Sequence, residues 1–128
     1  MENKIAQEEK DLLLKDLCAR LPYDVICKDD YAKIEGRLCQ IGTNYDMCLL
    51  SNDYGKTEFA YIPNCKPYLF PLSSMTDEQE KECQQVKNSY YYDDNSFVLF
   101  DWYNKNHFDY RGLIEKGLAI DATGKNIY

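Results

Sequence analysis

Turn-forming residues divide residues 23–62 into short segments, and this spacing of turns is the sequence feature that most restricts the possible folds. Asp29 and Asp30 form one turn cluster, and residues 51–55 (SNDYG) form another. The segments between the turns are residues 24–28, 31–41, 47–50 and 57–62. Short apolar segments joined by hairpin-sized loops predict antiparallel strands. We therefore expect a small antiparallel sheet of four to five strands, curled like an SH3-type barrel, with Gly36 at a bend or bulge.

Residues 2–21 have the apolar spacing of an amphipathic helix. Leu13, Leu17 and Leu21 recur at every fourth position, which places them on one helical face. Pro22 then ends the helix, because proline removes a backbone donor and disfavours helical geometry in the residue before it. We expect the leucine face to cover the sheet.

Prolines mark residues 63–75 as an extended segment. Pro63, Pro67 and Pro71 disfavour a helix, and the large apolar residues between them suit anchoring against the rest of the protein. This segment is predicted to be a strap that crosses from the sheet to the helices. A strap of this kind keeps the whole chain, residues 1–128, in a single α+β domain.

Two helices and a closing segment are expected after the strap. Residues 76–79 (TDEQ) approximate a capping box and predict a helix that runs to about Lys87. Residues 90–92 suit a short edge strand. Residues 96–106 are dense in large apolar side chains, which predicts the main core helix, and residues 107–120 then close the fold.

The acidic balance of the chain limits its partners. The formal net charge is −7 at pH 7. Nucleic-acid affinity comes largely from Lys and Arg that neutralise phosphates, so direct nucleic-acid binding is not expected, and anionic membrane surfaces are disfavoured. Twelve tyrosines suit a contact surface. We expect a protein partner, although the charge is also explained by solubility alone.

The cysteines and the N-terminal sequence indicate the cytoplasm. The first residues have no apolar signal core, and no apolar run reaches the roughly 18 residues of a membrane span. Six cysteines lie 9 to 18 residues apart without a C-x-x-C pair, so neither a metal site nor a cofactor is predicted. Disulfides would require an oxidising compartment.

Three blocks of sequence carry a resemblance to a known family. They are residues 66–69 (KPYL), residues 71–76 (PLSSMT) and residues 104–114 (NKNHFDYRGLI). Over about residues 11–120, the chain resembles a family of small proteins from gut Bacteroidales genomes, many carried on phages, prophages or other mobile elements. The resemblance implies a bacterial cytoplasm and a mobile-element accessory role. It supplies no activity, cofactor, partner or catalytic residue.

The first candidate binding site is His107, Asp109, Tyr110 and Arg111. A histidine can act as a general acid or base near neutral pH, and Asp109 could orient it, but the sequence shows no nucleophile or phosphate-binding loop. In the structural alternative, Asp109 caps the next turn, Arg111 pairs with an acid or with the carbonyls of a helix end, and Gly117 provides a left-handed stop. No catalytic residue is predicted. Any function is expected from Tyr110 and Arg111, not from catalysis by His107.

The second candidate binding site is acidic and rich in tyrosine. Its residues are Tyr90, Tyr91, Tyr92, Asp93 and Asp94, flanked by Asp77, Glu78, Glu80 and Glu82. A solvated helix face is the simpler interpretation. In the sharper hypothesis, the acids imitate the charge of nucleic acid and occupy a basic groove on a partner, with the tyrosines supplying contact area.

A third possibility is a small aromatic pocket in the strand region. Its residues would be Tyr31, Tyr45, Tyr54, Phe59 and Tyr61. The leading hypothesis is a non-enzymatic interaction protein, a mobile-element or phage accessory factor that binds and blocks a host protein. One alternative is a small-molecule or nucleotide-signal binder that uses Arg37, Lys66 and Arg111. The other is a small enzyme that uses His107.

Overall fold

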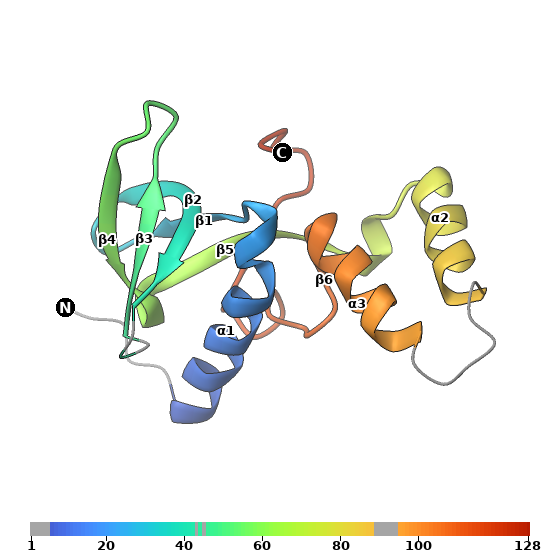
Figure 1. Ribbon diagram of the computed structural model, residues 1–128, viewed down its shortest axis with the longest axis horizontal. Helices are drawn as coiled ribbons and strands as arrows, with labels where there is room; N and C mark the ends of the chain where they lie inside the picture. The colour runs from blue at the N-terminus through green and yellow to red at the C-terminus, as the bar shows by residue number, and fades with distance from the viewer. Residues whose placement is uncertain (1–5, 43, 45, 89–94) are drawn as a thin grey trace.

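The chain has an α+β fold in which an N-terminal helix packs on a mixed sheet and two further helices lie to one side (Figure 1). The computed structural model describes residues 6–42, 44, 46–88 and 95–128. The elements are α1 (Gln7–Arg20), β1 (Ile26–Asp29), β2 (Ile34–Ile41), β3 (Met47–Ser51), β4 (Thr57–Tyr61), β5 (Cys65–Pro71), α2 (Asp77–Asn88), α3 (Asn95–Lys105), β6 (Phe108–Asp109) and β7 (Ile120–Asp121). Short 3-10 helices lie at Leu21–Tyr23, Ile62–Asn64 and Leu72–Ser74.

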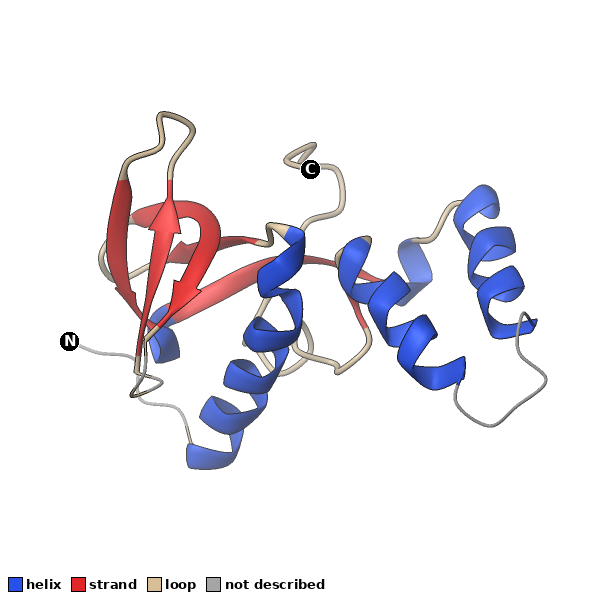
Figure 2. Cartoon of the chain, in the orientation of Figure 1, coloured by secondary structure: helices blue, strands red, loops and turns tan. Residues whose placement is uncertain are grey.

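The sheet, whose strands are red in Figure 2, has the strand order β4-β3-β2-β1-β5-β6, and β7 also pairs with β5. Neighbours from β4 to β5 are antiparallel, whereas β6 and β7 run parallel to β5. The four strands expected in residues 23–62 are confirmed, with small shifts at their ends. The sheet is open, so the expected curling does not close it into a barrel.

The proline-rich segment expected as a strap is strand β5, and this corrects the sequence prediction. Cys27 of β1 lies opposite Pro67, and Pro71 lies opposite Asp109 of β6. The expected extended path was right, because proline fixes a backbone angle that strands also use. Whether an extended segment pairs as a strand depends on partner strands elsewhere in the chain. The proline content of the segment itself does not reveal those partners.

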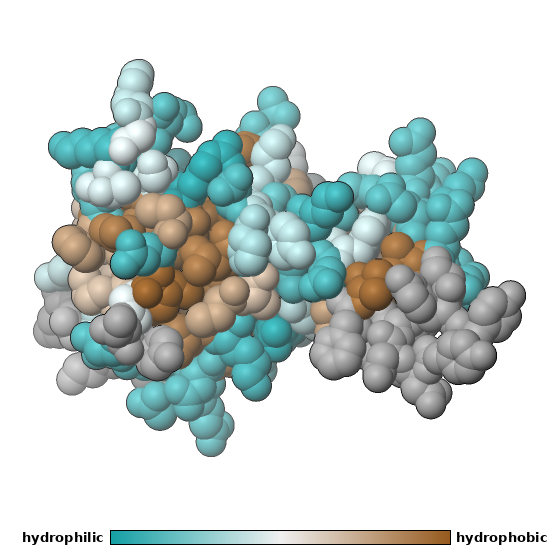
Figure 3. All heavy atoms as spheres, viewed as in Figure 1, coloured by the Kyte–Doolittle hydropathy of each residue, from teal (hydrophilic) through white to brown (hydrophobic). Residues whose placement is uncertain are grey.

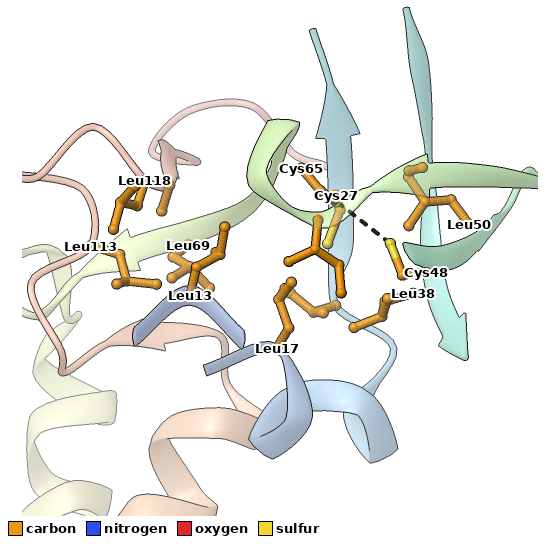
Figure 4. Packing of buried hydrophobic residues seen from close by; sticks show 14 residues of the cluster. Leu13, Leu17, Cys27, Leu38, Cys48, Leu50, Cys65, Leu69, Leu113 and Leu118 are labelled. Atoms are coloured by element: carbon orange, nitrogen blue, oxygen red, sulfur yellow. Dashed lines mark hydrogen bonds between the residues drawn. The ribbon is translucent and has the colours of Figure 1, made fainter. Parts of the chain in front are cut away.

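The main core lies between α1 and the sheet, as the leucine spacing predicted. Leu13 and Leu17 are fully buried and point toward Leu69 and Cys27 (Figure 4). Half-buried apolar residues flank this core, namely Leu12, Leu14, Leu21, Ile34, Ile41 and Ile114. Hydrophobic side chains accordingly reach the surface over the sheet next to α1 (Figure 3).

A second, smaller core joins α2, α3 and β6. Cys83, Trp102, Tyr103 and Phe108 form it, with Phe70 of β5 packed alongside. The helix expected over residues 96–106 is present, but it contributes to this second core and not to the main one. The expectation of a main core helix was therefore wrong, because its large side chains pack on α2 and β6.

Two local predictions can be checked atom by atom. Thr76 and Gln79 form the expected capping box, in which each backbone N–H donates to the side-chain oxygen of the other, at 2.9 and 3.1 Å. Gly36, by contrast, is not at the bulge, which lies between Leu38 and Gln40. A Cβ on Gly36 would collide with the carbonyl of Ser51, so glycine permits two backbones to approach closely there. Residues 90–92 lie outside the described residues.

Candidate functional site

His107 is held in place as a neutral, half-buried ring. It follows α3 with a positive φ of 63°, and its ring stacks on Tyr128 with 3.6 Å between centroids. Burial lowers the pKa of His107 to about 4, and the positive charges of Arg20 and Arg37 add to this effect. The Nδ1 atom is buried and has no hydrogen-bond partner among the described residues. At neutral pH the ring is therefore uncharged, with one face covered by tyrosine.

Asp109 caps a turn and does not orient His107. Its two carboxylate oxygens accept hydrogen bonds from the backbone N–H groups of Leu113 and Ile114, both at 2.9 Å. Gly117 has a φ of 74°, the left-handed conformation expected for a stop. Both features confirm the structural alternative for this segment.

Arg111 belongs to a buried ion network that the sequence did not reveal. Its Nε atom lies 3.2 Å from Oδ1 of Asp16, which is fully buried. Arg20 is also fully buried, and it donates from Nε to Oδ2 of Asp16 and from Nη2 to the carbonyl of Phe108, both at 2.7 Å. Asp16 and Arg20 are four residues apart on the buried face of α1, beside Leu13 and Leu17, and their spacing was the only signal of the pair. The network joins α1 to β6.

Tyr110 lies in the same cluster, between aromatic rings and cations. Its ring stacks with Phe100 and Tyr103, with 5.0 and 5.5 Å between centroids. The guanidinium carbons of Arg20 and Arg111 lie 5.3 and 4.9 Å from its centroid, which is cation–π distance. Tyr110 and Arg111 thus hold the closing segment on α1 and α3, and Asp109 caps a turn within that segment.

The acidic candidate site is described only in part. Residues 90–94, which include its tyrosines and Asp93 and Asp94, lie outside the described residues, so this cluster stays a prediction. On α2 the acids Asp77, Glu78, Glu80 and Glu82 are exposed. Glu82 also accepts a hydrogen bond from Nε1 of Trp102 at 2.9 Å, which ties α2 to α3.

The residues proposed for a small-molecule site do not converge. Arg37 lines a hollow of about 350 Å³ beside Glu35, and Lys66 lines a different hollow of about 240 Å³ beside Glu9. Arg111 is paired with Asp16, as described above. Of the aromatic candidates, Tyr31, Tyr54 and Phe59 are 57%, 95% and 69% exposed, and Tyr61 is half-buried. Tyr45 lies outside the described residues. The exposed rings therefore face solvent and do not enclose a pocket.

Large apolar side chains gather instead on the outside of β3 and β4. In the antiparallel pair, Met47 lies opposite Tyr61 and Leu49 lies opposite Phe59, so the four side chains share one face. We call these four residues the outer patch. The alternate residues Cys48, Leu50 and Ala60 are buried on the inner face. Strand β4 thus directs a small apolar residue inward and a phenylalanine outward, an arrangement that hydrophobicity alone does not predict.

Three buried thiols meet inside the curled sheet. Cys27, Cys48 and Cys65 are at most 2% exposed, and the sulfurs of Cys48 and Cys65 lie 4.0 Å apart (Figure 4). Hydrogen bonding to Cys65 and burial raise the pKa of Cys48, so this thiol stays protonated. Within the described ranges no set of His, Cys, Asp and Glu side chains has the geometry of a metal site.

No described helix combines the length and the apolar character needed to cross a membrane. Comparisons of the chain with protein-family models, with curated proteins and with solved structures give no match.

Proposed function

We propose that this chain is a protein-binding module whose contact surface is the outer patch of β3 and β4. The observation that carries the proposal is Phe59, which is 69% exposed on a strand whose neighbouring residue Ala60 is buried. Leu49, Met47 and Tyr61 lie around it on the same face. Tyr54, at the turn between the two strands, is 95% exposed. Exposed apolar patches with aromatic residues are typical of protein contact sites.

The partner we propose is a host protein in a bacterial cytoplasm. The resemblance to mobile-element proteins of Bacteroidales supports this setting. The net charge of −7 favours a basic partner surface, because opposite charges speed association and disfavour acidic competitors.

The residues on which the alternative functions depend do not form a suitable site. His107 stacks on Tyr128 with its Nδ1 atom buried, which does not suit a general base. Arg37, Lys66 and Arg111 lie apart, which does not suit a phosphate-binding pocket. Binding through an exposed apolar surface therefore has the better support.

Affinity capture from a Bacteroidales lysate tests the proposal. We expect the wild-type chain to enrich a host protein, and Phe59→Ser to reduce the recovery about tenfold, because an aromatic anchor contributes roughly 1.4 kcal/mol or more. Tyr31→Ser is the control, since Tyr31 is also an exposed aromatic residue, at 57%, but lies in the turn between β1 and β2. Direct binding of the purified captured protein then repeats the comparison. Equal recovery by both variants, or no enrichment at all, would contradict the proposal.

A further inference from the structure

The outer edge of β4 presents unpaired backbone groups. Asn52 donates to the carbonyl of Lys56, and Ile62 donates to the carbonyl of Asp46. In an antiparallel ladder the bonded residues alternate, so Glu58 and Ala60 also bond to β3.

The backbone groups of the alternate residues in β4 point away from β3. Thr57, Phe59 and Tyr61 direct both N–H and C=O away from β3. Strand β4 ends the strand order, and no other described segment pairs with this edge. The edge is therefore a template for another strand.

Strand β4 lacks three of the features that commonly protect an edge, namely proline, lysine and a bulge. Its sequence, TEFAY, has neither proline nor lysine, and its pairing with β3 has no register shift. The one charged residue of β4 is Glu58. Its side chain lies on the same face of the sheet as buried Ala60, which is the face opposite to Phe59. Nothing in the side chains of the outer face repels a second strand.

We propose that β4 pairs with β4 of a second copy of this chain, antiparallel, about a twofold axis at Phe59. In this register Phe59 lies opposite Phe59 of the second copy, and Thr57 lies opposite Tyr61. The backbone N–H and C=O groups of Thr57, Phe59 and Tyr61 in one copy then bond to those of Tyr61, Phe59 and Thr57 in the other. Every backbone group that β4 directs away from β3 is therefore paired.

The charges and the strand ends agree with the same register. Glu58 lies opposite Ala60 of the second copy, so the two glutamates do not face each other directly. A register centred on Thr57 would place Phe59 opposite Gly55, which has a φ of 79° in the turn and cannot continue the ladder. At the other end, the 3-10 helix Ile62–Asn64 terminates the strand. The twofold register at Phe59 is thus the one that uses the whole strand.

The pairing goes beyond the proposed function, because it uses the edge of β4 and leaves the outer patch facing solvent. It joins the outer patches of two copies into one surface with Phe59 at its centre. The interface is short and each copy carries a charge of −7, so we expect association to be weak and to strengthen with added salt.

Sedimentation equilibrium of the purified chain over a wide concentration range tests the pairing. We expect a monomer–dimer equilibrium for the wild type. Phe59→Lys and Phe59→Glu each place like charges opposite one another at the axis, so each alone should raise the dimer dissociation constant about tenfold. An equimolar mixture of the two variants should restore the dimer, because lysine then faces glutamate. Tyr54→Lys is the control, since Tyr54 is exposed in the turn outside the ladder.

A second variant probes the backbone without changing the outer patch. Thr57→Pro removes one outward N–H and leaves the hydrogen bonds to β3 in place, so it should weaken the dimer while circular dichroism and thermal unfolding stay unchanged. A wild type that is monomeric at every concentration would overturn the pairing. So would a dimer that survives Phe59→Lys, or a mixture of lysine and glutamate variants that fails to associate. Because no host protein is present, these outcomes are independent of the capture experiment.

Discussion

Asp109 holds the closing segment by accepting two backbone hydrogen bonds with one carboxylate. We expect Asp109→Ala to lower the free energy of unfolding by about 2 kcal/mol, because two N–H groups lose a charged acceptor. Asp109→Asn should cost less, since its amide keeps one acceptor oxygen. Glu115→Ala is the control, because Glu115 is an exposed acid in the same segment. Urea unfolding at neutral pH measures all three, and equal stability of the Ala and control variants would contradict the capping role.

His107 gives the fold a specific sensitivity to acid. Its pKa is about 4 in the folded chain, against an ordinary value of 6.5. Between these two pH values His107 is protonated in the unfolded chain and neutral in the folded chain. The contribution of the neutral ring to the free energy of unfolding is therefore fully present above pH 6.5 and is lost as the pH falls from 6.5 toward 4.

Replacing the imidazole should remove this part of the acid response. His107→Asn does not titrate, and asparagine tolerates the positive φ of 63°. Its loss of stacking on Tyr128 lowers stability by the same amount at each pH. We expect the wild type to lose more unfolding free energy than the variant between pH 7 and pH 4.5. Denaturant unfolding at both values measures the difference, and parallel losses would show that His107 does not contribute.

At the scale of elements, α1 is anchored by leucines and by an ion pair that share its buried face. Asp16→Ala should lower the free energy of unfolding by about 3–5 kcal/mol, because Arg20 then remains charged, buried and without its carboxylate. The double variant Asp16→Leu with Arg20→Met should lose much less than the sum of the losses of Asp16→Leu alone and Arg20→Met alone, since the buried guanidinium of Arg20 is removed together with its carboxylate. A double-mutant cycle measures the coupling. Additive losses would contradict a buried pair.

Elements with local signals could be predicted from the sequence. The capping box at Thr76 and Gln79 needs only four consecutive residues, and the face formed by Leu13 and Leu17 needs only helical spacing. Pro67 was misinterpreted because a strand and an unpaired extended segment share the same backbone angles, and only a distant partner such as Cys27 distinguishes them.

The candidate site depended still more on distant contacts. Arg111 was predicted to pair with an acid or with the carbonyls of a helix end, and its partner is Asp16, which lies far earlier in the chain on α1. The outer patch was missed because the large residue Phe59 is exposed whereas its small neighbour Ala60 is buried, the reverse of what their sizes suggest. Which face of a strand is buried depends on what packs against it, and that information lies in α1.

At the scale of the molecule, four of the six cysteines are buried in the two cores and the other two are accessible to solvent. Cys18 and Cys39 are exposed, whereas Cys27, Cys48, Cys65 and Cys83 are buried. We expect a thiol reagent to modify two thiols per chain under native conditions and all six in denaturant. Burial raises the pKa of Cys18, so we expect this thiol to react more slowly than a free thiol at the same pH. Rapid native reaction of more than two thiols would contradict the packing of the main core.

Strand β5 is shared by the two cores, since Leu69 belongs to the main core and Phe70 packs in the second. The molecule can therefore lose order in stages. If α2 and α3 detach, the half of β5 before Phe70 keeps its pairing with β1, so the main core can survive the event. Amide protons of α2 should then exchange with solvent much faster than those of β1, as hydrogen-exchange measurements would show. A mutation in α2 would in that case change how often part of the molecule opens without changing how firmly the remainder is folded.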